Sequence, residues 1–290
     1  MNYHSDEWIK NEMKEHLKES IKRRGGQKIV GLFYQGSGNY GLDTANSDVD
    51  TKLILVPTLR EVAMNDKPIS TTHIRENEAH TDEKDIRLYI DTFRKQNLNF
   101  LEILFTPYYY TNDAFAEQWA RLVKAREEIA HMNVWRAVQS MYGIAKEKYH
   151  AFEHPYPSKL DILAKHGYDA KQLHHLLRVE EYLCRYIDGE SYEDCLKSRF
   201  PEYLIDVKQF RYNYEEAVGV RDASMKRIDA ICKKFLNDHI QDENQETLEL
   251  LRDVQYNMIR DSIKSEATPQ IIEKVNLFYW RGVDELVAHG

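Results

Sequence analysis

The amino-acid sequence predicts an α/β or α+β fold, in which a small mixed sheet is followed by an all-helical region. Short runs of β-branched and apolar residues, which favour strands, occur before residue 112. After residue 112 the strand signals nearly vanish, and apolar residues recur at helical spacing. The 290 residues suffice for two hydrophobic cores, so we expect domains at 1–111 and 112–290 with a cleft between them.

The expected elements follow from turn and cap residues. A helix at 5–24 begins with Ser5 as its N-cap and stops at Gly25. The expected strands are 28–34, 48–56, 69–75 and 83–89, and the other helices of the first half are 41–45, 59–64 and 91–96. In the second half we expect helices at 113–130, 134–150, 170–188, 192–198, 214–237 and 243–265, with a loop at Pro155 and Pro157.

The composition is typical of a soluble cytoplasmic protein. The mean hydropathy is −0.66 and no long apolar run occurs, which excludes a membrane span. The first ten residues are polar, so no signal peptide is expected, and the three cysteines indicate neither a disulfide framework nor a zinc site. The net charge of −8 argues against a general nucleic-acid coat, although a local basic patch could bind an RNA end. The basic run at residues 22–24 is better explained as a helix C-terminus.

The most informative feature is a turn of small residues followed by two carboxylates. A short apolar run ends in the Gly-Ser-Gly turn at 36–38, where backbone N–H groups can approach phosphate oxygens closely. About ten residues further on, Asp48 and Asp50 are two positions apart on an expected strand, so they point to one side together with Lys52. Either feature alone is usually a loop or a solvated strand edge, but their combination is much more specific.

This combination predicts a metal-dependent site for phosphoryl or nucleotidyl transfer. Two carboxylates held together repel each other unless a cation lies between them, and hard divalent ions such as Mg²⁺ or Mn²⁺ take oxygen ligands together with substrate phosphates. Such ions can activate an attacking hydroxyl and neutralise a leaving pyrophosphate. Lys52 on the same side could pair with a carboxylate or contact a phosphate, and the sequence leaves both alternatives open.

At these residues the chain resembles the DNA polymerase β-like nucleotidyltransferase superfamily, whose signature is Gly-Ser, a short helix and then Asp-x-Asp on the next strand. The resemblance implies that Asp48 and Asp50 bind the metal ions. It also implies that the nucleoside triphosphate is held at Gly36, Ser37 and Tyr40.

The superfamily takes a third carboxylate from a later strand, and the chain offers Asp82, Glu83 and Asp85. We expect Asp85 to fill this role as a catalytic and metal-binding residue, because it opens the alternating run 85–89. The alternative is that Asp85 caps the helix that follows.

A narrower likeness covers approximately residues 30–235. The stretch 85–107 is similar to one found in predicted nucleotidyltransferases associated with RNA ligases and phages, and 167–178 resembles the Lys-x-x-x-His-Leu-Leu-Arg helix of that family. The chain departs from the family pattern at Leu98, where a proline is common, and at residues 38–39, where bulkier or basic residues are common.

A stripe of basic residues is expected on the helix at 170–188, because Lys171, His175 and Arg178 recur at steps of four and three. Such a stripe is often only a solvated surface. The surplus negative charge of a bound triphosphate favours another interpretation, in which Lys171 and Arg178 contact the β- and γ-phosphates and His175 orients the phosphates or the acceptor.

The predicted activity is the transfer of an NMP, with AMP favoured, from an NTP to a hydroxyl with release of pyrophosphate. An RNA or tRNA end is the favoured acceptor, and a protein or small-molecule hydroxyl competes with it. The alternative from another class is a nucleotide-binding sensor or interaction protein without turnover, against which the presence of both Asp48 and Asp50 speaks.

Overall fold

The computed structural model describes residues 3–45, 47–75, 77–267 and 278–280. Within these residues one sheet has the strand order β3-β4-β2-β1-β5-β6. Strands β2 and β4 are parallel and the other neighbours are antiparallel, so the predicted mixed sheet is confirmed. The strands are β1 (Ile29–Gln35), β2 (Asp50–Leu55), β3 (Ser70–Ile74), β4 (His80–Asp85), β5 (Tyr109–Asn112) and β6 (Phe278–Trp280).

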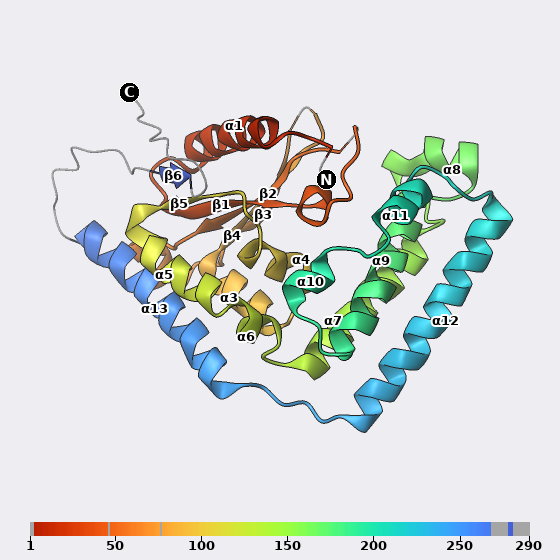
Figure 1. The fold of residues 1–290 in the computed structure, drawn as a ribbon. Helices are drawn as coiled ribbons and strands as arrows, with labels where there is room; N and C mark the ends of the chain where they lie inside the picture. The colour runs from red at the N-terminus through yellow and green to blue at the C-terminus, as the bar shows by residue number, and fades with distance from the viewer. Residues whose placement is uncertain (1–2, 46, 76, 268–277, 281–290) are drawn as a thin grey trace.

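Helices cover both faces of the sheet and build the second half, which confirms the α+β fold (Figure 1). The first group is α1 (Asp6–Arg24), α2 (Leu59–Ala63), α3 (Ile86–Arg94), α4 (Leu98–Leu101), α5 (Asp113–Lys124) and α6 (Arg126–Ala130). The second group is α7 (Val134–Ala151), α8 (Leu160–His166), α9 (Ala170–Ile187), α10 (Tyr192–Leu196), α11 (Pro201–Lys208), α12 (Tyr214–Asp238) and α13 (Gln245–Ala267). Short 3₁₀ helices are η1 (Ser37–Tyr40), η2 (Glu102–Leu104) and η3 (Pro157–Lys159). No helix within the described residues has the length and apolar content that a membrane crossing requires.

Two apolar clusters lie on the two faces of the sheet. On one face, Ile9, Met13 and Leu17 of α1 pack against Leu53 and Leu55 of β2. On the other face, a larger cluster continues from β1 through α3 and α5 into α7, α9, α12 and α13. The apolar stripes of the amphipathic helices therefore face one continuous core, which joins the sheet half to the helical half.

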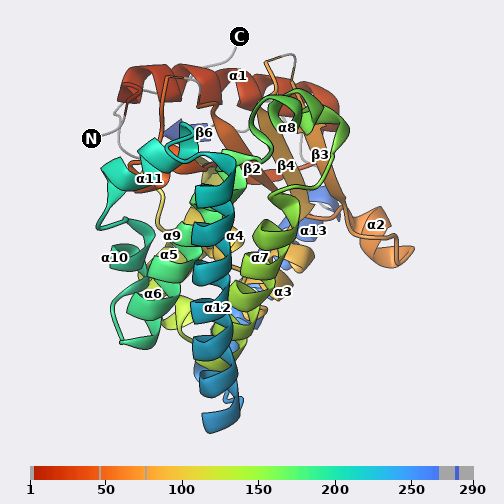
Figure 2. The same ribbon diagram turned by 90° about the vertical axis from the view of Figure 1, so that its right-hand side faces the viewer.

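The chain passes between the sheet half and the helical half twice, at two places that lie side by side in space. Helices α7, α9 and α12 pack together (Figure 2), whereas α13 returns to α3 and α5 beside the sheet. The chain enters this bundle after α6 and leaves it after α12, and at that place the Asn244 N–H donates to the Met132 carbonyl at 2.8 Å. The domain boundary expected at 111/112 stays a prediction.

Several elements differ from the sequence-based expectations. The strand expected at 83–89 is wrong, because β4 ends at Asp85 and α3 begins at Ile86. The buried residues Ile86, Tyr89, Ile90 and Phe93 recur at helical rather than alternating positions. The helix expected at 41–45 is also wrong, since the helical turn is η1 and ends at Gly41, whose φ of 69° is left-handed. Strand β6 pairs with β5, so the region after residue 112 is not entirely helical.

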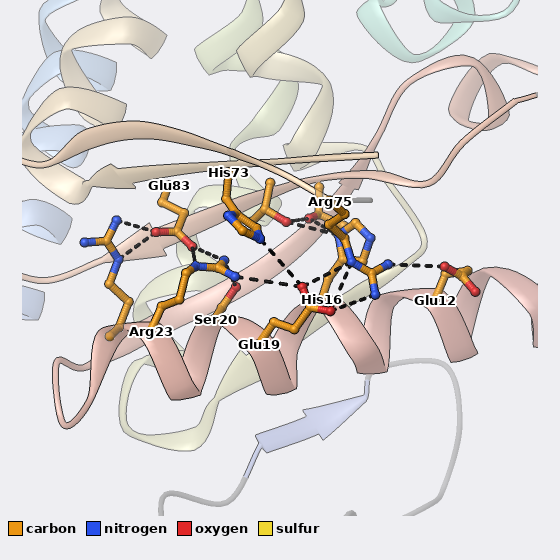
Figure 3. Close-up of polar contacts among 11 residues, drawn as sticks. Glu12, His16, Glu19, Ser20, Arg23, His73, Arg75 and Glu83 are labelled. Atoms are coloured by element: carbon orange, nitrogen blue, oxygen red, sulfur yellow. Dashed lines mark hydrogen bonds and ion pairs between the residues drawn. The ribbon is translucent and has the colours of Figure 1, made fainter. Parts of the chain in front are cut away.

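A polar network fixes α1 to the sheet (Figure 3). The buried Glu83 carboxylate of β4 accepts hydrogen bonds from Arg23 and Arg24, whose Nε atoms lie 3.2 and 2.6 Å from its oxygens. On the same helix, Glu19 accepts a hydrogen bond from Arg75 at 2.9 Å. A carboxylate taken out of water needs such cationic donors, so the residues of the basic run serve the internal packing of α1.

We expect Glu83→Ala to lower the free energy of unfolding by about 2 kcal/mol, because two partly buried guanidinium groups lose their acceptor. Urea unfolding measures the change. Glu15→Ala is the matched control, since its ion pair with Lys18 is exposed and is expected to contribute less than about 0.5 kcal/mol. Equal losses in the two variants would contradict the assigned role of Glu83.

His16 adds a pH-dependent contribution at the same interface. Its buried ring has Nδ1 2.9 Å from Thr51 Oγ1, and burial together with the Arg75 charge lowers its pKa to about 4. Between pH 6.5 and 4 the unfolded chain therefore binds a proton that the native state does not, so stability should fall as the pH falls through this window, by on the order of 3 kcal/mol. Burial also lowers the pKa of His174 to about 4 and that of His175 well below its usual range, so His16→Gln should remove about a third of the slope seen in urea unfolding at several pH values. An unchanged slope would contradict this assignment.

Candidate active site

The turn after β1 is held by its own backbone and by a buried carboxylate. Gly36 has a φ of 107°, a conformation that favours glycine, and its N–H donates to Glu102 Oε1 at 3.2 Å. A Cβ atom at Gly38 would lie 2.1 Å from the Tyr34 hydroxyl, so a larger residue here would have to displace the buried Tyr34 ring. The Tyr40 hydroxyl donates to Glu102 Oε2 at 2.9 Å, and the segment 36–40 is therefore clamped at both ends.

The two aspartates of the Asp-x-Asp pair lie beside this turn. Asp50 opens β2 opposite Gln35, and its Oδ1 accepts the His80 N–H at 2.8 Å. Asp48 precedes the strand and is exposed. Desolvation and repulsion from the Asp50 carboxylate raise the pKa of Asp48, whereas Lys171, His80 and Lys208 act in the opposite direction. The structure thus brings the two carboxylates close enough to repel each other.

Lys52 pairs with Asp82 and not with Asp48 or Asp50, the carboxylates that the sequence suggested. Lys52 is 2% exposed, and its Nζ lies 3.3 Å from Asp82 Oδ2 and 4.0 Å from the centre of the Phe100 ring. The Thr72 hydroxyl donates to the other Asp82 oxygen at 2.6 Å. Because the parallel register places Lys52 opposite Asp82, this carboxylate is on the sheet face of Lys52 and Asp50.

The expectation that Asp85 lies beside Asp48 and Asp50 is wrong. The register pairs Asp85 with Leu55, five residues from Asp50 along β2, which at about 3.3 Å per residue is about 16 Å. Asp85 instead caps α3, accepting hydrogen bonds from the Arg87 N–H at 2.8 Å and from its guanidinium at 2.7 and 2.9 Å. The helix-cap alternative therefore holds, and Asp82 is the carboxylate of β4 nearest in register to the pair.

The basic stripe of α9 faces the turn across the two halves. The Arg178 guanidinium stacks 3.6 Å above the Tyr40 ring and is only 6% exposed. Within the described part of the chain, its Nε and one Nη have no hydrogen-bond partner. A buried cation with unused donors is a group that an anionic ligand can satisfy.

Lys171 and His175 extend this wall toward the carboxylates. Lys171 is exposed and acts electrostatically on Asp48. Burial and the nearby His174, Lys171 and Arg178 lower the pKa of His175 well below its usual range, so its imidazole is neutral at neutral pH. A neutral ring can both donate and accept a hydrogen bond.

Sequence reasoning missed Lys208 and gave Glu102 no role in the site. Lys208 comes from α11, and its Nζ lies 3.3 Å from the hydroxyl of Ser47, which in turn lies 3.4 Å from the Ser37 hydroxyl. Burial and repulsion from Lys171 lower the pKa of Lys208. Nothing local in the sequence links α11 to the loop at 42–49, whereas Glu102 was visible within the family-like stretch at 85–107.

The donor set fits a divalent cation in part. Asp48 and Asp50 offer hard oxygen ligands, and a cation between them would relieve the repulsion that raises the pKa of Asp48. Among residues 3–45, 47–75, 77–267 and 278–280, however, no group of three or more His, Cys, Asp or Glu side chains is arranged to hold a metal ion. A substrate phosphate would have to supply further ligands.

A cavity of about 500 Å³ borders the turn, a volume typical of small-molecule sites. Its walls come from residues 38–41, from Phe105 and Tyr108, and from α10 and the segment that follows it. The cavity shares the turn with the candidate site, but neither the Asp-x-Asp pair nor Arg178 lines it, so the expected nucleotide cleft stays a prediction.

The chain matches the model of a known family. The model of RlaP, the RNA repair pathway DNA polymerase beta family, matches residues 9–189, which is more than half of the chain. No curated protein is significantly similar to it. The matched range includes the turn, the Asp-x-Asp pair and Arg178, and ends before Lys208.

We expect Asp85→Ala to lower the free energy of unfolding by about 1–2 kcal/mol, through loss of the helix cap and of the Arg87 ion pair, without changing the affinity for a nucleoside triphosphate. Urea unfolding and isothermal titration with ATP and Mg²⁺ measure the two quantities. Asp50→Ala is the comparison variant and should weaken nucleotide binding in the presence of Mg²⁺. A similar loss of affinity in Asp85→Ala would restore Asp85 to the site.

Proposed function

Because the chain belongs to the RNA repair pathway DNA polymerase beta family, we propose that it is a metal-dependent nucleotidyltransferase that moves an NMP from an NTP to a hydroxyl and releases pyrophosphate. The observation that carries the proposal is the position of Asp48 and Asp50 beside the Gly36–Ser37 turn, with Lys171 of α9 and Lys208 of α11 in electrostatic reach of Asp48. Carboxylates on one side and cations on the other suit a metal-bound polyphosphate.

In this mechanism Asp48 and Asp50 would hold Mg²⁺ or Mn²⁺, and Asp82 would take the role that the sequence suggested for Asp85. Lys52 keeps Asp82 ionised and oriented through their 3.3 Å contact. When bound, the metal ions lower the pKa of the attacking hydroxyl and neutralise the leaving pyrophosphate. His175, being neutral, can orient the acceptor hydroxyl.

The remaining residues bind and orient the phosphates. Ser37 presents its hydroxyl from the turn, and Tyr40 supports Arg178 by stacking. The unused donors of Arg178 and the ammonium groups of Lys171 and Lys208 would hold the β- and γ-phosphates. These contacts fix the α-phosphate in line with the acceptor, which is the main contribution that a protein makes to such a transfer.

AMP is the favoured transferred group, and an RNA or tRNA end is the favoured acceptor. The RNA repair description of the family and the exposed lysine beside the carboxylates support an acceptor that carries phosphates. A protein hydroxyl or a small-molecule hydroxyl would need fewer such cations. We assign the reaction to the cytoplasm, where NTPs and RNA are present.

The competing proposal is a nucleotide-binding sensor or interaction protein that lacks turnover. The buried, unpaired donors of Arg178 fit either protein, since both bind the polyphosphate. The presence of both Asp48 and Asp50, the carboxylate pair that metal-dependent transfer requires, together with membership of the family, favours the enzyme.

We expect Asp50→Ala to reduce label transfer from α-labelled ATP to pooled tRNA by at least about 100-fold, since it removes a ligand of the metal that stabilises the transition state. Asp91→Ala is the matched control, because Asp91 is half exposed and its ion-pair partner is Lys95 at the C-cap of the same helix. Removal of the divalent ion with EDTA should stop the reaction of the wild-type protein. ATP binding without transfer to RNA, protein or small-molecule acceptors would favour the sensor.

A further inference from the structure

Glu102 is a buried carboxylate in the middle of the proposed site, and the proposed transfer gives it no chemical role. It lies in η2 and is 4% exposed. Its two oxygens accept hydrogen bonds from different donors, the Gly36 N–H at 3.2 Å and the Tyr40 hydroxyl at 2.9 Å. Two accepted bonds on separate oxygens are the pattern of an ionised carboxylate.

This charge is surrounded by the cations that face the turn. Burial raises the pKa of Glu102, and Lys52 and Arg178 oppose that effect as the two strongest electrostatic partners. Lys52 also forms an ion pair with Asp82. Arg178 stacks 3.6 Å above the Tyr40 ring, whose hydroxyl donates a hydrogen bond to the Glu102 carboxylate. Glu102 is therefore a buried negative charge that interacts electrostatically with Arg178.

The arrangement of Arg178 differs from that of an ordinary buried ion pair. Its guanidinium makes no direct hydrogen bond to Glu102, and its Nε and one Nη stay without a partner among the described residues. A buried arginine that serves only stability normally forms direct, often bidentate, bonds to its carboxylate. Here the carboxylate supplies charge balance while the donors are left for a ligand.

We infer that Glu102 is a positioning residue that acts as the internal counter-charge of the phosphate site. It holds the 36–40 turn and Arg178 in the geometry that binds a polyphosphate, and its negative charge limits how tightly that polyphosphate is held. The inference rests on the proposed binding of a nucleotide at this turn. Its consequence is that Glu102 favours release of pyrophosphate after the transfer.

The direction in which a substitution of Glu102 changes phosphate affinity distinguishes a counter-charge from a residue that only supports the turn. A residue that only supports the turn would weaken phosphate binding when it is changed. A counter-charge would strengthen binding when its charge is removed and its shape is kept. At an effective dielectric constant of about 20, one unit charge several ångströms from a phosphate changes affinity by about tenfold or more.

Glu102→Gln is the direct test, because glutamine keeps the volume and can accept from Gly36 while donating to the Tyr40 oxygen. We expect the full-length variant to bind inorganic tripolyphosphate about tenfold more tightly than the wild-type protein in isothermal titration at low ionic strength. Tyr40→Phe, which removes a hydrogen bond but no charge, should not tighten binding. Glu249→Gln on the exposed surface of α13 is the control for net charge and should change the dissociation constant by less than about twofold.

A second measurement needs no variant. If Glu102 and the bound polyphosphate repel each other, binding must raise the pKa of the Glu102 carboxyl in the wild-type protein, which ¹³C NMR titration can follow. Equal or weaker tripolyphosphate binding by a folded Glu102→Gln, or an unchanged Glu102 pKa on binding, would overturn the inference. If the wild-type protein bound neither tripolyphosphate nor ATP, the proposed function would fail as well, whereas binding of both without tightening in the variant would remove the counter-charge role alone.

Discussion

The stacking of Arg178 on Tyr40 is the contact on which the proposed site depends. It joins α9 to the turn after β1, and each partner is fixed from its own side. Leu173, Leu176 and Leu177 bury the apolar face of α9, and Glu102 holds the Tyr40 hydroxyl. The cation is thereby placed opposite the turn before any ligand arrives. Such preorganisation reduces the entropy that a ligand would otherwise lose in ordering the site.

Local patterns sufficed to predict the mixed sheet, the Gly-Ser turn and the proximity of Asp48 and Asp50. Each strand taken singly, the turn and the Asp48–Asp50 spacing depend on residues within about fifteen positions of one another, where the period of two and the glycine signals are informative. Asp85 shows where this reasoning fails, because a run such as 85–89 fits both a short strand and the first turns of an amphipathic helix. The run forms a helix because Asp85 caps its N-terminus and because Tyr89 and Phe93 are buried against the core.

Contacts between distant segments could not be predicted from the sequence. Lys208 and Ser47 are separated by 161 residues, and their proximity follows from the packing of α11 against α9. Arg23 and Arg24 illustrate the converse, since a basic run that could suggest an RNA surface is used to neutralise the buried Glu83. The charge of a segment therefore indicates a ligand only when its internal partners are known.

The hydrogen bond between Asn244 and Met132 has a mechanical consequence for the molecule. Both polypeptide crossings between the bundle and the sheet half meet there, and the Trp135 indole donates to the Leu236 carbonyl at 3.1 Å close by. The two crossings are thus held beside each other, where α7 begins and α12 ends. Because the continuous apolar core also joins the bundle to the sheet half, a movement that separated Lys208 from Ser47 would expose part of that core to water.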